Sequence, residues 1–335
     1  MKLEGVRTLI TGGAGFIGSH LTERLLDMGA LVTVYDKFDG FYAGKEQNLS
    51  EASKRPGFRL VNGSILDRDL LDSTVAGNEV VFHLAGQAGV GFSVAHPRET
   101  DRVNVTGTLN VLLAARKHGV KRVVNASSSS IFGEPRYLPI DEDHPANPTS
   151  PYGVSKLAAE QYGRAFNRVY GTYVVSLRYF SVYGPRGRPD QVIHRFTKTL
   201  LEGGMPEIQG DGSHTRDFTY VSDIVAATIL AAESEGLGGN VFNIGYGSRV
   251  SVLELARKIN ELVAPGTALS PRYAPEGRGE FPHTQADNKK ARELLRWRPM
   301  VGLDEGLGLF VDWYRERTMD ASAQRDAVPS EVAAP

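Results

Sequence analysis

A glycine-rich segment near the start of the chain has the spacing of a phosphate-binding loop. Thr11-Gly-Gly-Ala-Gly-Phe-Ile-Gly18 follows an apolar run and precedes a stretch of helical periodicity. Glycines at this spacing let the backbone turn tightly and approach a pyrophosphate, whose negative charge then lies on the free amides of the helix start. The segment therefore predicts a dinucleotide site that includes Gly12, Gly15, Phe16, Ile17 and Gly18.

Asp36 supports this interpretation through its distance from the loop. It ends the next β-branched run about twenty residues further on, where a carboxylate can accept hydrogen bonds from the ribose hydroxyls. The same carboxylate would repel a 2′-phosphate, which favours NAD over NADP, although the neighbouring Lys37 weakens that preference. The alternative interpretation of Asp36 is an acidic turn residue at the end of a strand.

Tyr152 and Lys156 are the residues best suited to proton chemistry. On a helix their i, i+4 spacing puts them on one face, where a nearby ammonium favours the phenolate over the phenol. A phenolate can act as a base near neutral pH. Such a pair alone is common by chance and is most often a surface pair without function. Here the pair follows a dinucleotide loop and the serine-rich segment Asn125–Gly133, and this combination is far less common by chance than the pair alone.

A further segment, His83-Leu-Ala-Gly-Gln87, ends another apolar run. Its small residues would let the end of a strand pass close to a cofactor. Contacts with the cofactor are therefore predicted for Leu84, Ala85, Gly86 and Gln87. His83 alone is more typical of a packed core histidine than of a catalyst.

The elements that must position these residues alternate in type along the first half of the chain. Short β-branched runs and stretches of helical periodicity follow one another, as in a doubly wound parallel sheet with helices on both faces. The predicted strands are Arg7–Thr11, Leu31–Tyr35, Phe58–Asn62, Val80–Leu84, Arg122–Ala126 and Tyr173–Leu177. The predicted helices include Phe16–Met28, Asp101–Lys117 and Pro151–Tyr170, the last capped by Thr149 or Ser150. We expect six or seven parallel strands.

After Tyr179 the pattern changes to isolated helices between loops rich in glycine and proline. These helices are predicted over Val192–Leu201, Val252–Leu262 and Leu303–Arg315, whereas Val221–Glu233 and Val241–Ile244 are predicted as a helix and a strand that return to the sheet. We assign residues 1–178, completed by about 217–247, to a dinucleotide-binding domain, and residues 179–216 and 248–317 to a smaller substrate-binding lobe. Residues 318–335 are expected to form a disordered tail.

Composition excludes several classes of protein. The 335 residues suffice for two lobes, and 38 Lys and Arg against 39 Asp and Glu leave a net charge of -1. Without a basic excess, neither nucleic acid nor a membrane is an expected partner. The absence of cysteine excludes disulfides and Cys-ligated metals and agrees with a cytoplasmic location; no metal site is expected. No secretion signal and no apolar stretch of about 18 residues is found.

Together these motifs resemble the short-chain dehydrogenase/reductase superfamily, in its extended branch of nucleotide-sugar epimerases, dehydratases and decarboxylases. The resemblance runs from Leu9 to about Trp313. It includes Asn104-Val-Thr-Gly-Thr108, Ser150-Pro-Tyr-Gly-Val-Ser-Lys156, Leu177-Arg-Tyr-Phe-Ser-Val-Tyr-Gly-Pro-Arg186 and Arg216-Asp-Phe-Thr-Tyr-Val-Ser-Asp223. It implies an α/β fold with a Rossmann-like doubly wound parallel sheet and a smaller mixed α/β substrate-binding lobe.

The resemblance also implies roles for individual residues. Ser128 would hydrogen-bond the sugar O4, Tyr152 would accept and donate the proton, and Lys156 would bind the ribose and tune the tyrosine. Further cofactor contacts implied by the resemblance are Ser64, Ile65, Asn104, Tyr179 and Val182. Ser64 departs from the family, which often has an acid before the apolar residue that touches adenine.

The reaction and the sugar are narrowed by two further features. Related dehydratases and decarboxylases usually carry an acid where Ser129 or Ser130 stands, and a hydroxyl cannot do the proton work of a carboxylate, which favours epimerisation at C4. The lobe looks most like that of bacterial UDP-glucuronate 4-epimerases, in which Arg188, and less surely Arg186, would face the C6 carboxylate. The alternative is that both are solvated loop arginines. Other substrate contacts implied by the resemblance are Ser129, Ser181, His194, Gln209, Arg216 (on the UDP diphosphate), Val252 and Arg278.

We therefore expect an NAD-dependent 4-epimerase that converts UDP-glucuronate to UDP-galacturonate through a transient 4-keto sugar. The alternatives are a 4-epimerase of UDP-glucose or UDP-N-acetylglucosamine, a relative of the decarboxylases and dehydratases, or a non-catalytic NAD-binding protein. The resemblance further implies a homodimer formed through the helices that begin near Asp101 and Pro151.

Overall fold

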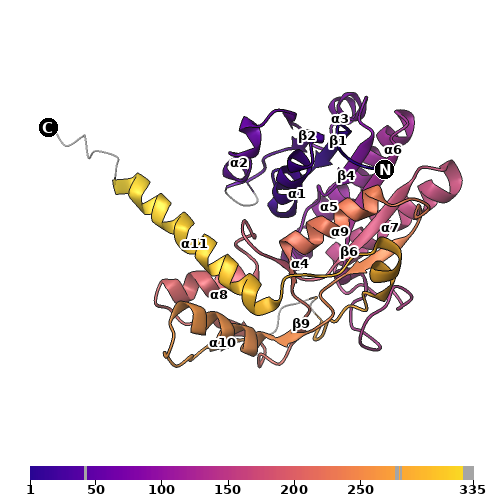
Figure 1. The fold of residues 1–335 in the computed structure, drawn as a ribbon. Coiled ribbons are helices and arrows are strands. Elements are labelled where there is room, and N and C mark those ends of the chain that lie inside the picture. Colours follow the sequence, from indigo (N-terminus) through magenta and orange to yellow (C-terminus); the bar gives the residue numbers. More distant parts are fainter. Residues whose placement is uncertain (41–43, 276–278, 280, 327–335) are drawn as a thin grey trace.

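The protein is built on a seven-stranded parallel sheet. Figure 1 shows the computed structural model of the chain. The structure describes residues 1–40, 44–275, 279 and 281–326, with side chains up to residue 318. The strands are β1 (Arg7–Thr11), β2 (Leu31–Asp36), β3 (Phe58–Asn62), β4 (Val80–His83), β5 (Arg122–Ser128), β6 (Val174–Tyr179) and β11 (Val241–Ile244). Their order is β11-β6-β5-β4-β1-β2-β3, which confirms the predicted doubly wound parallel sheet.

The sheet reverses its order of winding between β1 and β4. From β1 the chain moves outward to β2 and β3 and then returns to the other side of β1 to form β4, β5 and β6. Ligands bind in the crevice at such a switch point, outside the carboxyl ends of the strands. In register, Thr11 at the end of β1 pairs with Tyr35 of β2 and His83 of β4, so the loops that follow these three strands open side by side.

Helices cover both faces of the sheet, so its central strands β1, β4, β5 and β6 are almost completely buried. On one face, α1 (Phe16–Asp27) and α9 (Val221–Glu233) pack against each other and share a core with the sheet. On the other face lie α3 (Arg68–Val75), α6 (Gly107–Lys117) and α7 (Pro151–Tyr170) (Figure 1). The shorter helices α2 (Lys45–Asn48), α4 (Val90–Ala95) and α5 (Pro97–Asp101) lie in the loops between them.

The predicted helix over Asp101–Lys117 is interrupted. The chain is helical from Pro97, passes through a wide π-helical turn at Arg102–Thr106, and resumes the α-helical course at Gly107. A Cβ on Gly107 would lie 2.4 Å from Ile65 Cδ1, so this glycine permits the close approach of α6 to the loop after β3. Hydrophobic periodicity does not distinguish a π turn from an α turn, which is why the sequence predicted one helix.

A smaller lobe contains three amphipathic helices and short strand pairs. Helices α8 (Val192–Leu201), α10 (Val252–Val263) and α11 (Leu303–Asp326) enclose a core that includes Phe196, Leu255 and Phe310. The short strands are β7 (Val182–Tyr183) with β10 (Thr219–Tyr220), β8 (Glu207–Gln209) with β13 (Arg272–Ala274), and β9 (Thr215–Arg216) with β12 (Val250–Ser251). Only the last pair is antiparallel, so the lobe is mixed α/β as predicted.

The C-terminal helix is longer than the sequence predicted. It was expected to end at Arg315 and to give way to a disordered tail at Thr318, but α11 continues to Asp326. Residues 327–335 of the predicted tail lie outside the described residues. The helices of the described ranges include none with the length and apolar character needed to cross a membrane.

Candidate active site

A cavity opens at the switch point of the sheet, and most of the predicted cofactor residues line it. We call it the cofactor cavity. Its predicted members are Gly12, Gly15, Phe16, Ile17, Gly18, Asp36, Lys37, Ser64, Ile65, Leu84, Ala85, Gly86, Gln87, Tyr152, Lys156 and Tyr179. Further lining residues, which the sequence did not single out, include Tyr35, Asp39, Lys45, Gly63, Ala126 and Ser127.

The glycine loop leaves room that side chains would fill. Gly12 has φ 73°, and a Cβ there would lie 2.7 Å from Ala85 N of the neighbouring strand end. A Cβ on Gly18 would lie 2.2 Å from Gly12 O. Helix α1 begins after Gly15, which makes no side-chain cap, so the first amides of α1 have no side-chain acceptor from that position. This cradle fits the pyrophosphate of a dinucleotide.

Asp36 ends β2 inside the cavity and is firmly held there. Its carboxylate accepts hydrogen bonds from Ala14 N (3.2 Å) and Phe38 N (3.0 Å) and lies 3.5 Å from Lys45 Nζ. Lys37 pairs with Asp39 at 2.8 Å. Burial opposes ionisation of Asp39, but hydrogen bonds from Lys37 and Lys45 lower the pKa of this carboxyl overall. Because Asp39 compensates the charge of Lys37, that lysine does little to offset the repulsion of Asp36 for a 2′-phosphate.

Helix α7 delivers the predicted proton-transfer pair to the same cavity. Ser150 Oγ caps the helix by accepting from Gly153 N at 3.1 Å. A Cβ on Gly153 would lie 2.4 Å from Ser130 O, so the first turn of α7 packs directly against the short turn Ser129–Ile131 that follows β5. Lys156 Nζ donates to Ala126 O at 2.9 Å and lies 6.0 Å from the centre of the Tyr152 ring. The structure therefore brings Tyr152 and Lys156 together beside the end of β5.

Glu160 continues the face of α7 that carries Tyr152 and Lys156. Its carboxylate is completely buried and accepts from Ser127 Oγ (3.0 Å), Arg178 Nε (2.9 Å) and Arg178 Nη2 (2.7 Å). It therefore ties the helix to β5 and β6 next to the cavity. Sequence reasoning missed it, although its i+4 spacing from Lys156 was a usable signal.

Ser128 lies at the end of β5, and its contacts are local. Its hydroxyl accepts from Ser130 N at 3.1 Å and donates to Ser130 Oγ at 3.2 Å, which caps the short turn Ser129–Ile131. Ser128 and Ser129 are buried and do not belong to the lining of the cofactor cavity, whereas Ser127 does.

Asn104 and His83 lie behind the cavity wall. The Asn104 side chain accepts from Gln87 N (2.7 Å) and donates to Gln87 O (3.0 Å) and Ser155 Oγ (2.9 Å), so the π turn fixes the loop after β4 to α7. His83 hydrogen-bonds Thr11 and Thr108. Burial, with a smaller contribution from Lys156, lowers the pKa of His83 to about 3. His83 is therefore a neutral core histidine, as predicted.

A second cavity of about 550 Å³ lies between the sheet and the smaller lobe. Its predicted members are Ser181, Val182, Arg188, Gln209, Arg216 and Val252, and it also includes Phe92, His214 and Phe218. Arg216 donates to Thr215 O and Pro282 O and lies over the ring of Phe281. Val182 was predicted as a cofactor contact but lines this second cavity.

Arg188 is the predicted substrate residue that lines both cavities. Its Nε and Nη2 donate to the two carboxylate oxygens of Asp190, at 2.9 and 3.0 Å. This is the parallel two-bond geometry with which a guanidinium holds a carboxylate. The cation is thus placed where the end of the cofactor site meets the second cavity.

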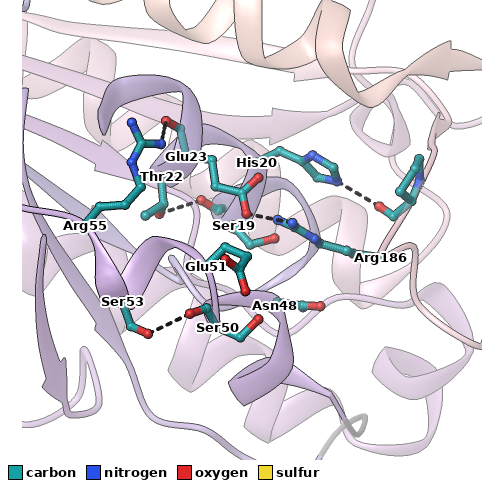
Figure 2. Close-up of polar contacts among 12 residues, drawn as sticks. Ser19, His20, Thr22, Glu23, Asn48, Ser50, Glu51, Ser53, Arg55 and Arg186 are labelled. Atoms are coloured by element: carbon teal, nitrogen blue, oxygen red, sulfur yellow. Dashed lines mark hydrogen bonds and ion pairs between the residues drawn. The ribbon is translucent and has the colours of Figure 1, made fainter. Parts of the chain in front are cut away.

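Ser128, Ser129, Arg186 and His194 were predicted as substrate residues, and none of them lines the second cavity. Arg186 pairs with Glu23 of α1 at 2.6 Å and lines neither cavity (Figure 2). His194 packs edge-on against Tyr314, and its Nδ1 donates to Gly187 O at 3.1 Å. Arg278 lies outside the described residues. Position in sequence alone could not show that Arg186 and Arg188, two residues apart in a turn, face different neighbours.

The conformation of Arg186 is unfavourable. Its φ of 65° is left-handed, which costs a non-glycine residue about 1–3 kcal/mol. Its Nη1 is buried without a hydrogen-bond partner among the described residues, which costs about 1–3 kcal/mol more. The partly exposed pair with Glu23 returns only about 0.2–1 kcal/mol. Stability therefore does not account for this arginine.

His20 lies beside this pair on α1. Its Nε2 bonds Pro185 O at 2.8 Å, and since a carbonyl can only accept, Nε2 carries the proton. Burial, together with the nearby charge of Arg186, lowers the pKa of His20 to about 4, so the imidazole is neutral at physiological pH. In the described ranges, no cluster of three or more His, Cys, Asp or Glu residues is arranged to hold a metal ion.

Comparison with known proteins agrees with this geometry. Residues 8–245 match the model of the NAD dependent epimerase/dehydratase family. A UDP-glucose 4-epimerase of Mycolicibacterium smegmatis is 39% identical over 318 residues, which are 93% of this chain and 100% of the relative. A UDP-glucuronate 4-epimerase of Thermodesulfobacterium geofontis is 36% identical over 314 residues, which are 92% and 96% of the two chains.

A solved structure extends the agreement to three dimensions. The UDP-glucuronic acid 4-epimerase of Bacillus cereus, in complex with UDP-glucuronic acid and NAD, superposes with a TM-score of 0.88 at 34% identity, covering 92% of this chain and 99% of its own. NAD as the cofactor and the resemblance to the extended dehydrogenase/reductase branch are thereby confirmed. With a family model over most of its length and relatives that match nearly all of it, the chain belongs to the NAD-dependent epimerase/dehydratase family and acts in nucleotide-sugar chemistry.

Proposed function

We propose that the protein is a 4-epimerase that interconverts UDP-glucuronate and UDP-galacturonate. The observation that carries the proposal is the position of Arg188 at the junction of the cofactor cavity and the second cavity. Its guanidinium already holds the carboxylate of Asp190 by two hydrogen bonds. The C6 carboxylate of a glucuronate has the same chemistry and would take the place of Asp190.

The reaction follows from the pair on α7. Tyr152 accepts the proton of O4 while C4 is oxidised, and the ammonium of Lys156, anchored on Ala126 O, lies on the same face of α7 beside it. When bound, NAD supplies the hydride acceptor and donor. The resulting 4-keto sugar rotates within the site so that C4 recovers the hydride on its opposite face. Tyr152 then returns the proton to O4. Ser128 is proposed to hold O4 during both steps.

Two features support epimerisation over loss of carbon dioxide or water. The turn after β5 carries Ser129 and Ser130 where an acid would serve a dehydratase or decarboxylase, and neither hydroxyl can replace a carboxylate. The buried carboxylate of Glu160 is committed to Arg178. A 4-keto glucuronate is a β-keto acid, and we propose that the grip of Arg188 on its carboxylate suppresses decarboxylation.

UDP-glucose and UDP-N-acetylglucosamine are the second candidate substrates. The 39% identity to a UDP-glucose 4-epimerase and the 36% identity to a UDP-glucuronate 4-epimerase are too close to decide between them. The test is turnover of all three UDP-sugars with identification of the products. UDP-galacturonate as the main product supports the proposal, whereas a pentose product or a preference for a neutral sugar contradicts it. Inactivity on all three would favour a non-catalytic NAD-binding protein.

Replacing Arg188 tests the assignment of the carboxylate. Arg188→Ala is expected to lower kcat/KM for UDP-glucuronate at least about tenfold while leaving UDP-glucose turnover, if any, little changed. Arg195→Ala is the matched control, because Arg195 lines the second cavity without reaching the cofactor cavity. Equal losses in the two variants would show that only the general positive charge matters.

We also propose that the protein forms a homodimer through α6 and α7. Both helices carry apolar side chains that the single chain leaves exposed, among them Leu113 (43%), Val154 (54%) and Val169 (67%). Large exposed apolar side chains on two helices that contact each other favour a protein interface there.

A further inference from the structure

The turn that carries Arg188 is attached to the helix of the cofactor loop. His20 Nε2 donates to Pro185 O at 2.8 Å, and Arg186 Nη2 donates to Glu23 Oε1 at 2.6 Å. His20 and Glu23 lie on α1, three residues apart, so both reach the same side of the helix. Figure 2 shows the two contacts next to each other, bridging α1 and the turn.

The other side of the same turn is attached to α8 and to its own strand. His194 Nδ1 donates to Gly187 O at 3.1 Å. Gln191 Oε1 accepts from Arg188 N at 3.1 Å, while Gln191 Nε2 donates to Val182 O at 3.1 Å. The backbone of Arg188 is therefore held from the smaller lobe as well. Among the described helices that cover the sheet, α1 is the one whose side chains hydrogen-bond Pro185 and Arg186.

Arg186 occupies this position at a cost in stability. Its backbone is left-handed, which glycine adopts freely and asparagine more readily than other residues. One of its guanidinium nitrogens is buried without a partner among the described residues. Strained residues of this kind persist where the arrangement serves a function rather than the fold.

We propose that His20, Glu23 and Arg186 form a latch that positions Arg188 against the substrate. The proposal rests on the function proposed above, and it assigns to these three residues a positioning role, with no contact to the reacting atoms. It explains why the cation of Arg186, expected from the sequence to face the sugar, turns instead toward α1. Through the latch, the helix that begins at the cofactor loop also sets the geometry of the sugar site.

The experiment breaks the ion pair without removing side-chain volume. Glu23→Gln is expected to raise the KM for the sugar that the wild type prefers by about tenfold, with kcat and the melting temperature nearly unchanged. Asp27→Asn is the matched control, since it breaks the pair between Asp27 and Arg55 on the same helix (2.8 Å) but touches nothing in the turn. It should leave KM at the wild-type value.

A second set of variants separates the side chain from the backbone. In Arg186→Asn, the asparagine can adopt the left-handed backbone, but its side chain is too short to reach Glu23. This variant should therefore raise KM as Glu23→Gln does. The reciprocal pair Glu23→Arg with Arg186→Glu restores opposite charges and should bring KM back toward the wild-type value.

The outcomes are distinguishable from failure of the proposed function. An unchanged KM in Glu23→Gln, a raised KM that the reciprocal pair does not rescue, or a joint fall of kcat and melting temperature would each overturn the latch. A wild type that prefers UDP-glucose would contradict the proposed substrate, yet the latch is then judged by the same ratios of KM on that sugar.

Discussion

His83 shows how burial sets the protonation of a single side chain at the floor of the site. It lies between Thr11 and Thr108 beneath the glycine loop, and burial lowers its pKa to about 3 from an ordinary value of 6.5. Between these two pKa values, His83 is protonated in the unfolded chain but stays neutral in the folded protein. The free energy of unfolding contributed by His83 therefore falls as the pH falls from 6.5 toward 3.

This dependence predicts a measurable difference between the wild type and His83→Asn. The loss of unfolding free energy caused by His83 should amount to about 2 kcal/mol by pH 5 and should increase further below that pH. The measurement is urea unfolding at several pH values between 7 and 4, and the wild type should lose stability faster than the variant as the pH falls. Parallel profiles would show that His83 is accessible to protons in the folded state.

Asp217 makes the comparison with a variant necessary. Burial raises the pKa of this carboxyl to about 7, although the backbone amides of Ala286, Gly247 and Tyr246 oppose the shift. Here the folded protein binds the proton first, so the contribution of Asp217 to stability grows as the pH falls from about 7 to 4. The two groups act in opposite directions, and the difference between two proteins that share Asp217 isolates His83.

Sequence reasoning singled out the pair proposed for proton transfer but not the residues that hold its helix in place. Tyr152 and Lys156 were found because their spacing on one helix has a chemical meaning. Glu160 and Arg178 come from different elements, and their pairing depends on the register of β6 beside β5, which brings Arg178 opposite Ser127. Arg186 points away from the second cavity because the left-handed turn at that residue, which no pattern of residue types signals, directs its side chain toward α1.

At the scale of elements, the contact between α7 and the turn after β5 (Ser129–Ile131) sets the position of Tyr152. Gly153→Ala would place a methyl group 2.4 Å from Ser130 O, and neither backbone can yield without moving the first turn of the helix. We expect this variant to lose both melting temperature and kcat. The measurement is thermal unfolding together with initial rates on the preferred UDP-sugar.

The matched control is the same substitution in another helix. Gly308 lies within α11, and a Cβ there would meet no atom within 4 Å. Gly308→Ala should therefore stabilise the protein by about 0.5–1 kcal/mol, since alanine favours a helix over glycine. If Gly153→Ala behaved like Gly308→Ala, the close packing of α7 on the turn after β5 would not be required for activity.

Elements were predictable from sequence where one physical signal dominated. The β-branched runs predicted the strands of the parallel sheet to within two residues at each end, because strands covered on both faces are rich in β-branched residues. Helix α11 was predicted too short because its last turns lack an apolar stripe, and the Ala and Ser of that segment were taken for a tail. Alanine, glutamine and arginine are in fact strong helix formers, so intrinsic propensity was the better guide there.

At the scale of the whole molecule, the candidate site lies between the sheet domain and the smaller lobe, and the chain passes from one to the other more than once. The chain leaves the sheet after β6, builds part of the lobe, returns with α9 and β11, and leaves again. Hydropathy patterns predicted the return of α9 and β11 but not that the turn at residues 184–188 would contact α1, because such a contact depends on how the sheet domain and the lobe pack. The limits of the two domains remain a prediction.

The exposed side of α6 and α7 is the proposed interface of a homodimer, which can be tested by measuring the oligomeric state. Exposed apolar groups there include Tyr162 and Val169 of α7, whose exposed fractions are 37% and 67%. Val169→Glu would place a charge in the proposed interface, where burying it without a partner is strongly unfavourable. We expect light scattering after gel filtration to give a dimer for the wild type and a shift toward monomer for this variant.

Met300 provides the control, because it is more exposed than Val169, at 80%, but lies in the segment before α11, far along the chain from the proposed interface. Met300→Glu should leave the dimer intact, since its new charge stays in water. A wild type that runs as a monomer, or equal effects of the two substitutions, would contradict the proposed interface. Arg188, Tyr152 and Lys156 of one chain line one cavity, so the proposed sugar site needs no second chain and a monomeric Val169→Glu should retain turnover. Activity and assembly can therefore be measured independently on the same variant.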